Sequence, residues 1–356
     1  MSHPSSVQEP PPADLSEDDG AKLIVLSCVF SVLCIAVVSA RFWAATKKKA
    51  RLWWDDWLCI PSLFFALSLN AINITMVQVA GVGRHSASFG DEAPIMLGKW
   101  AKILYFELLA YSFAVPLPKI VLLLFYVRIF SNPKFKVAVY AIATFVIAWC
   151  PAVFLTDLFQ CKPVAFGWDK TLSGGGTCID VLAFFRYIAV PAVMSDAAVL
   201  VLPLPLIWQL NMTQKQKMAL SGVFVLGSLG LIASIVRMVI FFQSEAFADP
   251  TWDAVTLLAW TMVEVDAVLI AACLPPLRPL FISFVQSTSK LTSKVHHRLG
   301  KTNESSSSHS GSGGVQKEGF TRIDDESGIR RTWEVELVET NSSQHELKDD
   351  RPGAFV

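Results

Sequence analysis

The sequence predicts an all-α fold: a polytopic membrane protein that crosses the bilayer as a bundle of seven transmembrane helices. The first observation is composition, because 53% of the 356 residues are hydrophobic and 17% are charged, whereas soluble domains carry about 25% charged residues. The second is that apolar residues gather into long segments, and about 20 of them are needed to cross a hydrocarbon core of about 30 Å. The third is an uneven distribution of lysine and arginine between the loops, which predicts orientation.

Seven apolar segments are long enough to span a membrane. Each is separated from the next by a loop that contains polar or charged residues, so successive segments are expected to cross in alternate directions. The expected transmembrane helices cover residues 22–44, 53–79, 103–126, 137–158, 185–208, 219–242 and 254–274.

Lysine and arginine are concentrated in the loops on one side of the predicted bundle. The 45–52, 127–136 and 209–218 loops and the segment after the seventh span together carry fourteen of them. Residues 1–19, which precede the first span, carry five acidic residues and no lysine or arginine. Because basic loops stay in the cytosol, we expect the N-terminus outside the cell and the C-terminus in the cytosol.

Three regions are predicted along the chain. Residues 1–21 form a proline-rich, acidic and disordered extracellular tail, residues 22–285 form the transmembrane domain, and residues 286–356 form a disordered cytosolic tail. The last assignment rests on the run SSSSHSGSGG at 305–314, because such a composition buries too little apolar surface to fold. The lipid bilayer is therefore the first expected partner, and no binding to nucleic acid is expected.

Two of the seven cysteines are predicted to form a disulfide bond. Cys161 and Cys178 both fall in the 159–184 loop, which the predicted orientation places in an oxidising compartment. The sixteen residues between them include three consecutive glycines, and closing a ring of this size restrains the loop by about 3 kcal/mol. A zinc site would need two further ligands, which this loop does not supply.

Six of the ionisable residues inside the predicted spans form a candidate intramembrane polar network. A charge at the centre of the bilayer costs about 2.5 to 3.5 kcal/mol unless it is paired or hydrated, so each of these residues is a candidate functional residue. The six are Glu107, Lys119, Asp196, Arg237, Glu264 and Asp266.

Depth along each helix predicts which of these residues meet. Glu107 and Arg237 both lie within about 10 Å of the outer surface, at about 1.5 Å per residue, and are expected partners. Lys119 lies deeper, and its flexible stem can reach Asp196 near the midplane. Two roles for that pair remain open: an ion pair that locks the bundle, or a switch that responds to a ligand, a proton or a conformational change.

Glu264 and Asp266 lie near the midplane of the seventh span, about 200° apart around the helix. One of the two carboxylates is expected to face the bundle, and the other a neighbouring helix or water. No basic residue is evident at the depth of Glu264, which favours a functional role for this residue.

Prolines predict where two of the helices bend or end. Pro191 and the LPLP run at 202–205 remove backbone donors from the fifth span and are expected to kink it, which would let the helix pivot. Pro275 and Pro276 are expected to stop the seventh helix.

Several motifs resemble those of a known family, in both order and spacing. They are KIVLLLFYVRIF at 119–130, the loop pattern Cys161, Pro163, Trp168 and Cys178, DAAVLVLPLPLIWQL at 196–210, Arg237, and VEVDAVLIAACLPPLRPL at 263–280. Over about residues 20 to 285 the chain resembles the fungal rhodopsin-domain family, also called the SAT4-type integral membrane family.

The resemblance implies a seven-helix fungal membrane protein. The family includes Pth11-like proteins, regarded as G-protein-coupled receptors for surface or nutrient cues, and some members are encoded beside secondary-metabolite genes. The resemblance also implies that Lys119, Asp196, Arg237 and Glu264 occupy recurrent intramembrane polar positions.

Two departures limit what the resemblance implies. Pth11-like proteins often carry an extracellular CFEM domain with eight cysteines, whereas residues 1–21 contain no cysteine. A retinal protein needs a lysine in its last helix, because only an amine condenses with the aldehyde. Residues 254–274 contain no lysine and Lys119 lies on another helix, so neither retinal nor any other cofactor is expected.

A receptor-like sensor is the favoured function. Its outer vestibule would be formed by the 80–102 and 159–184 loops, the ligand would be a small molecule or a surface cue, and the basic inner loops would meet a heterotrimeric G protein or another cytosolic signalling partner. The expected location is the plasma membrane.

The alternative is a transporter or channel. Association with a secondary-metabolite gene cluster is part of that expectation. In that case the midplane acids would coordinate protons or cations. An enzyme is not expected, because no histidine lies in the predicted spans and the sequence contains no HExxH or GxSxG motif.

Overall fold

The computed structural model describes residues 17–47, 52–205, 214–243 and 249–301, and for 214–220 and 278–301 it describes the backbone alone. Most of the predicted tails, and parts of the basic loops at 45–52 and 209–218, therefore lie outside the described residues. The chain divides into two compact units, residues 1–293 and 294–356. The helix bundle belongs to the first unit, and the described part of the second is the helical segment that ends at Lys301.

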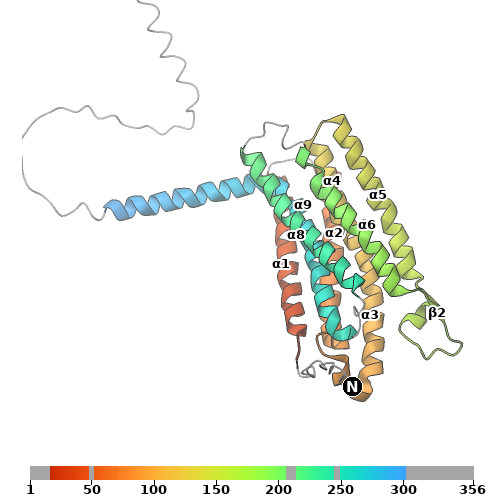
Figure 1. Ribbon diagram of the computed structural model, residues 1–356. Coiled ribbons are helices and arrows are strands. Elements are labelled where there is room, and N and C mark those ends of the chain that lie inside the picture. Colours follow the sequence, from red (N-terminus) through yellow and green to blue (C-terminus); the bar gives the residue numbers. More distant parts are fainter. Residues whose placement is uncertain (1–16, 48–51, 206–213, 244–248, 302–356) are drawn as a thin grey trace, which may run out of the picture. The chain divides into compact units, whose positions relative to one another are not determined.

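The predicted seven spans are confirmed. Seven segments are helical and are long and apolar enough to cross a membrane, and the third of them, Ser86–Ile129, combines η1, α3 and α4. The elements are α1 (Gly20–Lys47), α2 (Trp54–Ala80), η1 (Ser86–Glu92), α3 (Ala93–Ala114), α4 (Pro116–Ile129), α5 (Pro133–Leu158), β1 (Cys161–Lys162), η2 (Val164–Gly167), β2 (Thr177–Cys178), α6 (Val181–Val201), α8 (Gln214–Phe242) and α9 (Pro250–Lys301) (Figure 1).

Prolines break two of the spans, though not always where the sequence predicts. The third span changes from α3 to α4 at Pro116 and Pro118, which lack the backbone N–H groups that would continue the hydrogen-bond ladder. In the fifth span, Pro191 lies inside α6, and α6 ends at Val201. The LPLP run at 202–205 therefore follows the end of α6 instead of kinking it.

The prediction that Pro275 and Pro276 stop the seventh helix is wrong, because α9 continues to Lys301. Pro276 has no N–H to donate to the carbonyl of Ala272, four residues earlier. The guanidinium of Arg41, on α1, donates to that carbonyl instead, at 2.8 Å from Nη1. A charged donor from another helix thus satisfies the acceptor that the proline leaves free.

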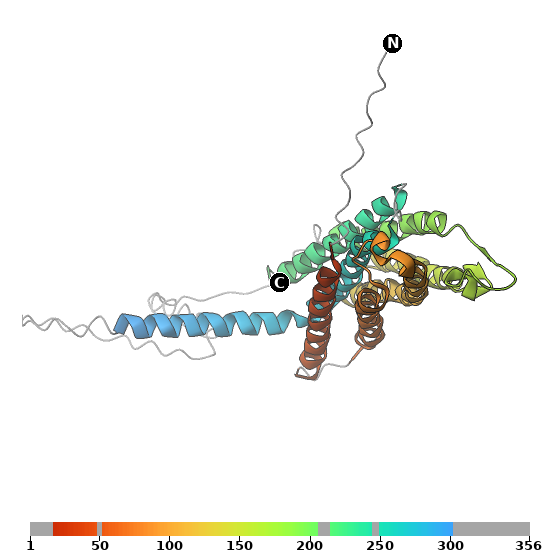
Figure 2. The same ribbon diagram turned by 90° about the horizontal axis from the view of Figure 1, so that it is seen from below.

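Helix α9 is the central element of the bundle. Within its span 72% of the residues in the most apolar window are buried, compared with 17% to 50% in the other six spans. Ala271, Ala272 and Cys273 are fully buried, and small residues of this kind let membrane helices approach closely. Around it, α2 packs on α1, α3 and α4, and α6 packs on α8; α1 lies beside α2 in both views (Figure 1, Figure 2).

Apolar side chains cover the outside of the bundle. Val32, Phe64 and Val137 are 66%, 64% and 69% exposed, which would be unfavourable in water but suits contact with lipid tails. Trp53 and Trp54 at the start of α2 are also exposed, as is typical of the aromatic belt at a membrane interface. The protein is therefore a multi-pass membrane protein embedded in lipid.

The predicted disulfide bond between Cys161 and Cys178 is present. The two cysteines face each other across the short antiparallel pair of β1 and β2. The ring of Trp168, from the same loop, packs against Tyr105 of α3 at a centroid distance of 5.3 Å, which ties the loop to the bundle. The end of the bundle that carries this loop is called the disulfide end, and the opposite end, where α1 ends and α2 begins, the Arg41 end.

Candidate functional site

A cavity of about 300 Å³ lies at the disulfide end, among α3, the disulfide-bonded loop and the start of α6. We call it the vestibule. Its walls combine aromatic and aliphatic side chains with the disulfide itself. The residues that line it are Trp100, Ala101, Leu104, Tyr105, Leu108, Gln160, Cys161, Gly167, Trp168, Lys170, Cys178, Val181, Leu182 and Phe185.

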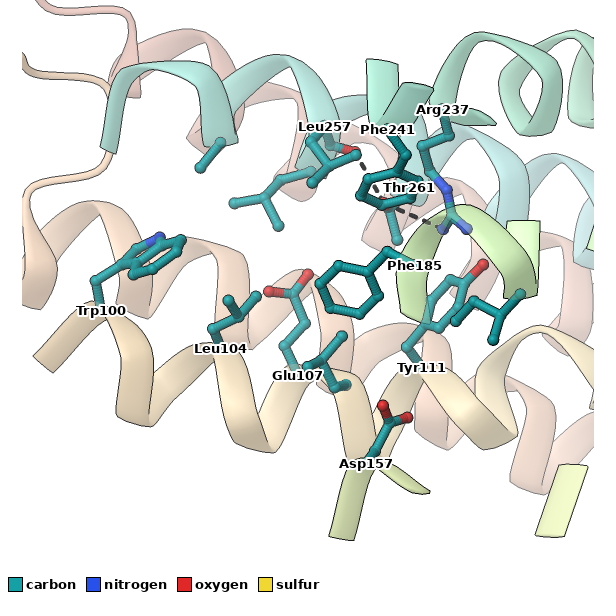
Figure 3. A pocket seen from close by; sticks show the side chains of 14 residues that line it. Trp100, Leu104, Glu107, Tyr111, Asp157, Phe185, Arg237, Phe241, Leu257 and Thr261 are labelled. Carbon is teal, nitrogen blue, oxygen red and sulfur yellow. Dashed lines mark hydrogen bonds between the residues drawn. The ribbon is translucent and has the colours of Figure 1, made fainter. Parts of the chain in front are cut away.

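A smaller cavity, of about 50 Å³, lies further into the bundle. We call it the inner cavity, and it shares Trp100, Leu104, Leu108 and Phe185 with the vestibule. A cavity needs about 10 to 15 Å³ to accept one water molecule, so the inner cavity has room for a few waters or for the head group of a ligand. Its lining is Trp100, Leu104, Glu107, Leu108, Tyr111, Asp157, Phe185, Ile188, Arg237, Phe241, Ala254, Leu257, Leu258 and Thr261 (Figure 3).

Two carboxyl groups line the inner cavity without a basic partner among the described residues. Glu107 comes from α3 and Asp157 from the end of α5, and their exposed fractions are 3% and 2%. Glu107 Oε2 is buried and makes no hydrogen bond within the part of the chain that the structure describes. Figure 3 shows the Glu107 carboxyl between Trp100 and Phe185. The cavity therefore contains buried acceptors with unused hydrogen-bonding capacity.

Arg237, from α8, lines the same cavity but is paired elsewhere. Its Nη1 lies 3.1 Å from Glu264 Oε2, and its guanidinium lies over the ring of Tyr111, 4.5 Å from the centroid. The expected pairing of Arg237 with Glu107 is therefore wrong, because no ion pair joins them among the described contacts. Both side chains line the inner cavity, but Arg237 is held by Glu264 and Tyr111, so a similar depth did not bring the two groups into contact.

The ion pair also corrects the expectation for Glu264, since a basic residue does lie within reach of it. The hydroxyl of Tyr111 donates to both carboxylate oxygens of Glu264 at 3.4 Å. Arg237 Nη1 also donates to Thr261 Oγ1 at 3.5 Å. This cluster forms the floor of the inner cavity and joins α3, α8 and α9.

Lys119 and Asp196 form an ion pair, with Nζ 2.9 Å from Oδ1. Lys119 Nζ also donates to Ser195 Oγ at 3.0 Å, and Ser234 Oγ donates to Asp196 Oδ2 at 2.6 Å. A third cavity, of about 30 Å³, is lined by Lys119, Ser195 and, like the inner cavity, by Tyr111, Ile188 and Arg237. The three cavities thus follow one another from the disulfide end to this ion pair.

Asp266 faces a different side of α9 from Glu264, as the angle between them predicts. Its carboxylate accepts hydrogen bonds from Cys34 Sγ on α1 at 3.4 Å and from Asn70 Nδ2 on α2 at 3.2 Å. The candidate polar network is consequently divided, because Asp266 contacts α1 and α2 and takes part in neither ion pair of the network.

Sequence reasoning missed the densest ion cluster, at the Arg41 end. Arg41 Nη2 lies 2.6 Å from Asp55 and 2.9 Å from Asp56, and Arg128 Nη1 lies 3.3 Å from Asp55. Asp157 was missed as well. The signal was present, since Arg41, Asp55, Asp56 and Asp157 all fall inside predicted spans, but near their ends, where charges usually reach water.

The fold and the site together define a seven-helix integral membrane protein with a buried, charged cavity at one end. The fungal rhodopsin domain family matches the chain over residues 40–283, which extends from late α1 to just beyond the span of α9. The chain belongs to this family, and the resemblance predicted from the motifs is confirmed.

Three relatives illustrate the range of the family. The polyenoic acids biosynthesis gene cluster protein Ba17b of Metarhizium anisopliae is 32% identical over 273 residues, which is 74% of each chain. Receptor GIN3 of Arthrobotrys oligospora is 26% identical over 83% of this chain and 70% of the receptor. A SAT4 family membrane protein of Emericella nidulans is 29% identical over 63% of this chain and 56% of its own length. No solved structure matches the chain.

Proposed function

We propose that this protein is a receptor-like sensor in the plasma membrane, which binds an extracellular small molecule and signals to a cytosolic partner such as a heterotrimeric G protein. The observation that carries the proposal is the series of cavities that begins at the disulfide end and reaches two ion pairs, one between α4 and α6 and one between α8 and α9. The predicted orientation places the disulfide end outside the cell.

The contacts at the floor of the cavity suit signal transmission. Arg237 touches the cavity and pairs with Glu264 of α9, so a ligand that displaces Arg237 changes a contact of the central helix. An ion pair inside a membrane is expensive to break, so a ligand that engages Arg237 would favour one of two arrangements, with the pair made or broken. Such a two-state element is what a ligand needs in order to shift a conformational equilibrium.

Two relatives support the proposal. One is named a receptor and another a protein of a biosynthetic gene cluster, which together favour a sensor of a small organic molecule. A transporter is the second candidate, because the same cavities lead to Glu264 and Asp196, acidic groups of the kind that carry protons in transporters.

The test compares two activities of the full chain. In nanodiscs, the protein is mixed with a purified fungal heterotrimeric G protein and recruitment is measured; in liposomes, proton and cation flux are measured. Recruitment without flux supports the receptor. Flux without recruitment replaces it with the transporter, and neither activity, with correctly folded protein, rejects both.

A further inference from the structure

We propose that the inner cavity binds the protonated amine of an apolar ligand, in a lining that contains the carboxyl groups of Glu107 and Asp157 and several aromatic rings. The inference rests on the proposed function in that it names the ligand class of the same site. The charge of the lining, its unused hydrogen-bonding capacity and the sizes of the two cavities support this ligand class.

Two acidic side chains of the inner cavity are buried without an ion-pair partner among the described residues. Glu107 and Asp157 are almost fully buried, yet neither forms an ion pair with a described residue. A buried carboxyl group without a partner takes up a proton instead of keeping its charge, and it can ionise when a cation binds beside it. Glu107 Oε2, buried and without a hydrogen bond in the described part of the chain, faces the space where that group would lie (Figure 3).

The charged residues of the lining indicate the charge of the ligand. Arg237 is the basic residue in the lining of the inner cavity, and its charge is balanced by Glu264. Glu107 and Asp157 are therefore the acidic groups of the lining that can ionise to balance a bound cation. An anionic ligand would lie beside two acidic groups, and a neutral one would gain no charge pairing, whereas an ammonium group supplies both the positive charge and several N–H donors.

The aromatic residues of the lining also indicate the ligand class. Trp100, Tyr111, Phe185 and Phe241 line the inner cavity with aromatic rings. Aromatic faces attract an ammonium ion through their quadrupole, most strongly where water is excluded. Carboxylates flanked by aromatic rings thus match an amine better than they match a metal ion, which prefers a shell of oxygen ligands.

The sizes of the two cavities match a ligand with a small charged group and a larger apolar body. The inner cavity, of about 50 Å³, accommodates a head group, while the vestibule, of about 300 Å³, accommodates an apolar body. Trp100 and Phe185 line both cavities, so one ligand can extend across their junction. Trp100 Nε1 makes no hydrogen bond among the described residues and offers a donor to an acceptor in the ligand body.

The experiment uses three probes that differ only in the group at the end of a common two-carbon chain: tryptamine, tryptophol and indole-3-propionate carry an ammonium, a hydroxyl and a carboxylate. Binding to the full chain in nanodiscs is measured by equilibrium binding and by the shift in unfolding temperature. We expect tryptamine to bind and to raise the unfolding temperature, with binding at least about tenfold weaker for the other two.

Substitutions locate the binding. Glu107→Gln and Asp157→Asn keep the shape of each side chain but remove its charge, and each should weaken tryptamine binding about tenfold or more. Neither should lower the unfolding temperature of the ligand-free protein, because neither side chain has an ion-pair partner to lose among the described residues. Glu92→Gln, an exposed change at the start of the same span, is the matched control and should bind tryptamine like the unmodified protein.

Two results would overturn the inference: equal or tighter binding of indole-3-propionate, or tryptamine binding that both charge-removing variants retain. The outcome is separable from that of the receptor proposal. Amine binding that depends on Glu107, without recruitment of a G protein, upholds the ligand class and rejects the receptor. Recruitment without amine binding upholds the receptor and rejects the ligand class.

Discussion

The two ends of the helix bundle treat buried charge in opposite ways. At the Arg41 end, the guanidinium of Arg41 lies 2.6 and 2.9 Å from Asp55 and Asp56, and Arg128 lies 3.3 Å from Asp55, so two bases balance two acids. At the disulfide end, Glu107 and Asp157 are buried as deeply but have no ion-pair partner among the described residues. The buried acids are therefore paired with bases of the protein at one end, and at the other end they are available to pair with a ligand.

The difference teaches what each end is built to do. Completed ion pairs fix the relative positions of helices, because separating them exposes a charge to a poor solvent. Arg41 adds a hydrogen bond to the carbonyl of Ala272, so α1, α2 and α9 meet at one side chain. Incomplete groups beside a cavity, in contrast, favour the binding of a complementary ligand. Stability and binding are thus separated along the bundle axis.

Removing Arg41 should destabilise the protein more than any other substitution proposed here, because it removes the buried base of the Arg41 end. Arg41→Met keeps much of the side-chain volume but leaves Asp55 and Asp56 with the partly exposed Arg128 as their base, and breaking a buried pair from one side costs about 3 to 5 kcal/mol. We expect poor expression or a large fall in unfolding temperature, measured in detergent micelles. Lys22→Met is the control, because Lys22 is 75% exposed and pairs only at the surface with Asp19. Similar effects of the two changes would refute the assigned role.

The ion pair between Lys119 and Asp196 lies between the two ends, and a charge swap sharpens its role. Lys119→Asp and Asp196→Lys each place two like charges together and should destabilise the protein by about 3 kcal/mol or more. The double variant restores opposite charges and should recover more than half of the loss, as a double-mutant cycle measures. No recovery would show that Ser195 and Ser234, rather than the pair itself, hold these helices.

Much of the fold could be predicted from the sequence, because spans and their ends follow from composition and length. The prolines show where this fails. Pro275 and Pro276 obey a local rule that ends a helix, but the rule was overridden by a hydrogen bond from Arg41, more than 200 residues away in the chain. A tertiary contact of this kind leaves no local pattern in the sequence.

The site was predictable in depth but not in rotation. Lys119 and Asp196 were matched by depth along their helices, and they form an ion pair. Glu107 and Arg237 were matched in the same way and do not, since Arg237 turns toward Glu264 on α9. Depth follows from counting residues, whereas the direction in which a helix faces is set by its packing against neighbours.

The disulfide bond gives a test confined to the loop at the binding end. Replacing both Cys161 and Cys178 by serine releases a ring whose closure contributes about 3 kcal/mol of restraint, so amide hydrogen exchange should rise across residues 161–178. The helices should keep their protection, because the loop is tied to them mainly through Trp168 and Tyr105. Cys28→Ser, at an exposed free cysteine, is the control. Increased exchange throughout the helices would contradict a local role.

The smallest expected effect is at the same end, where Asp249 joins the start of α9 to the turn before η1. Its carboxylate accepts a hydrogen bond from the backbone N–H of Ser86 at 3.0 Å and lies 2.8 Å from Nδ1 of His85, whose ring stacks on Trp252. Burial raises the pKa of Asp249, but the hydrogen bonds from Ser86 and His85 lower it by more, so the pKa lies below its ordinary value.

A carboxylate with a lowered pKa stabilises the folded state above its unfolded-state pKa, about 3.9 for aspartate, and loses that contribution as the pH falls through the folded-state value. Asp249→Asn should therefore lower stability by roughly 1 kcal/mol or less near neutral pH. The difference in unfolding temperature between the unmodified protein and the variant should shrink toward zero below about pH 3.9. A difference that persists unchanged in acid would show that the side-chain amide disturbs packing, and that the charge of Asp249 does not stabilise this end.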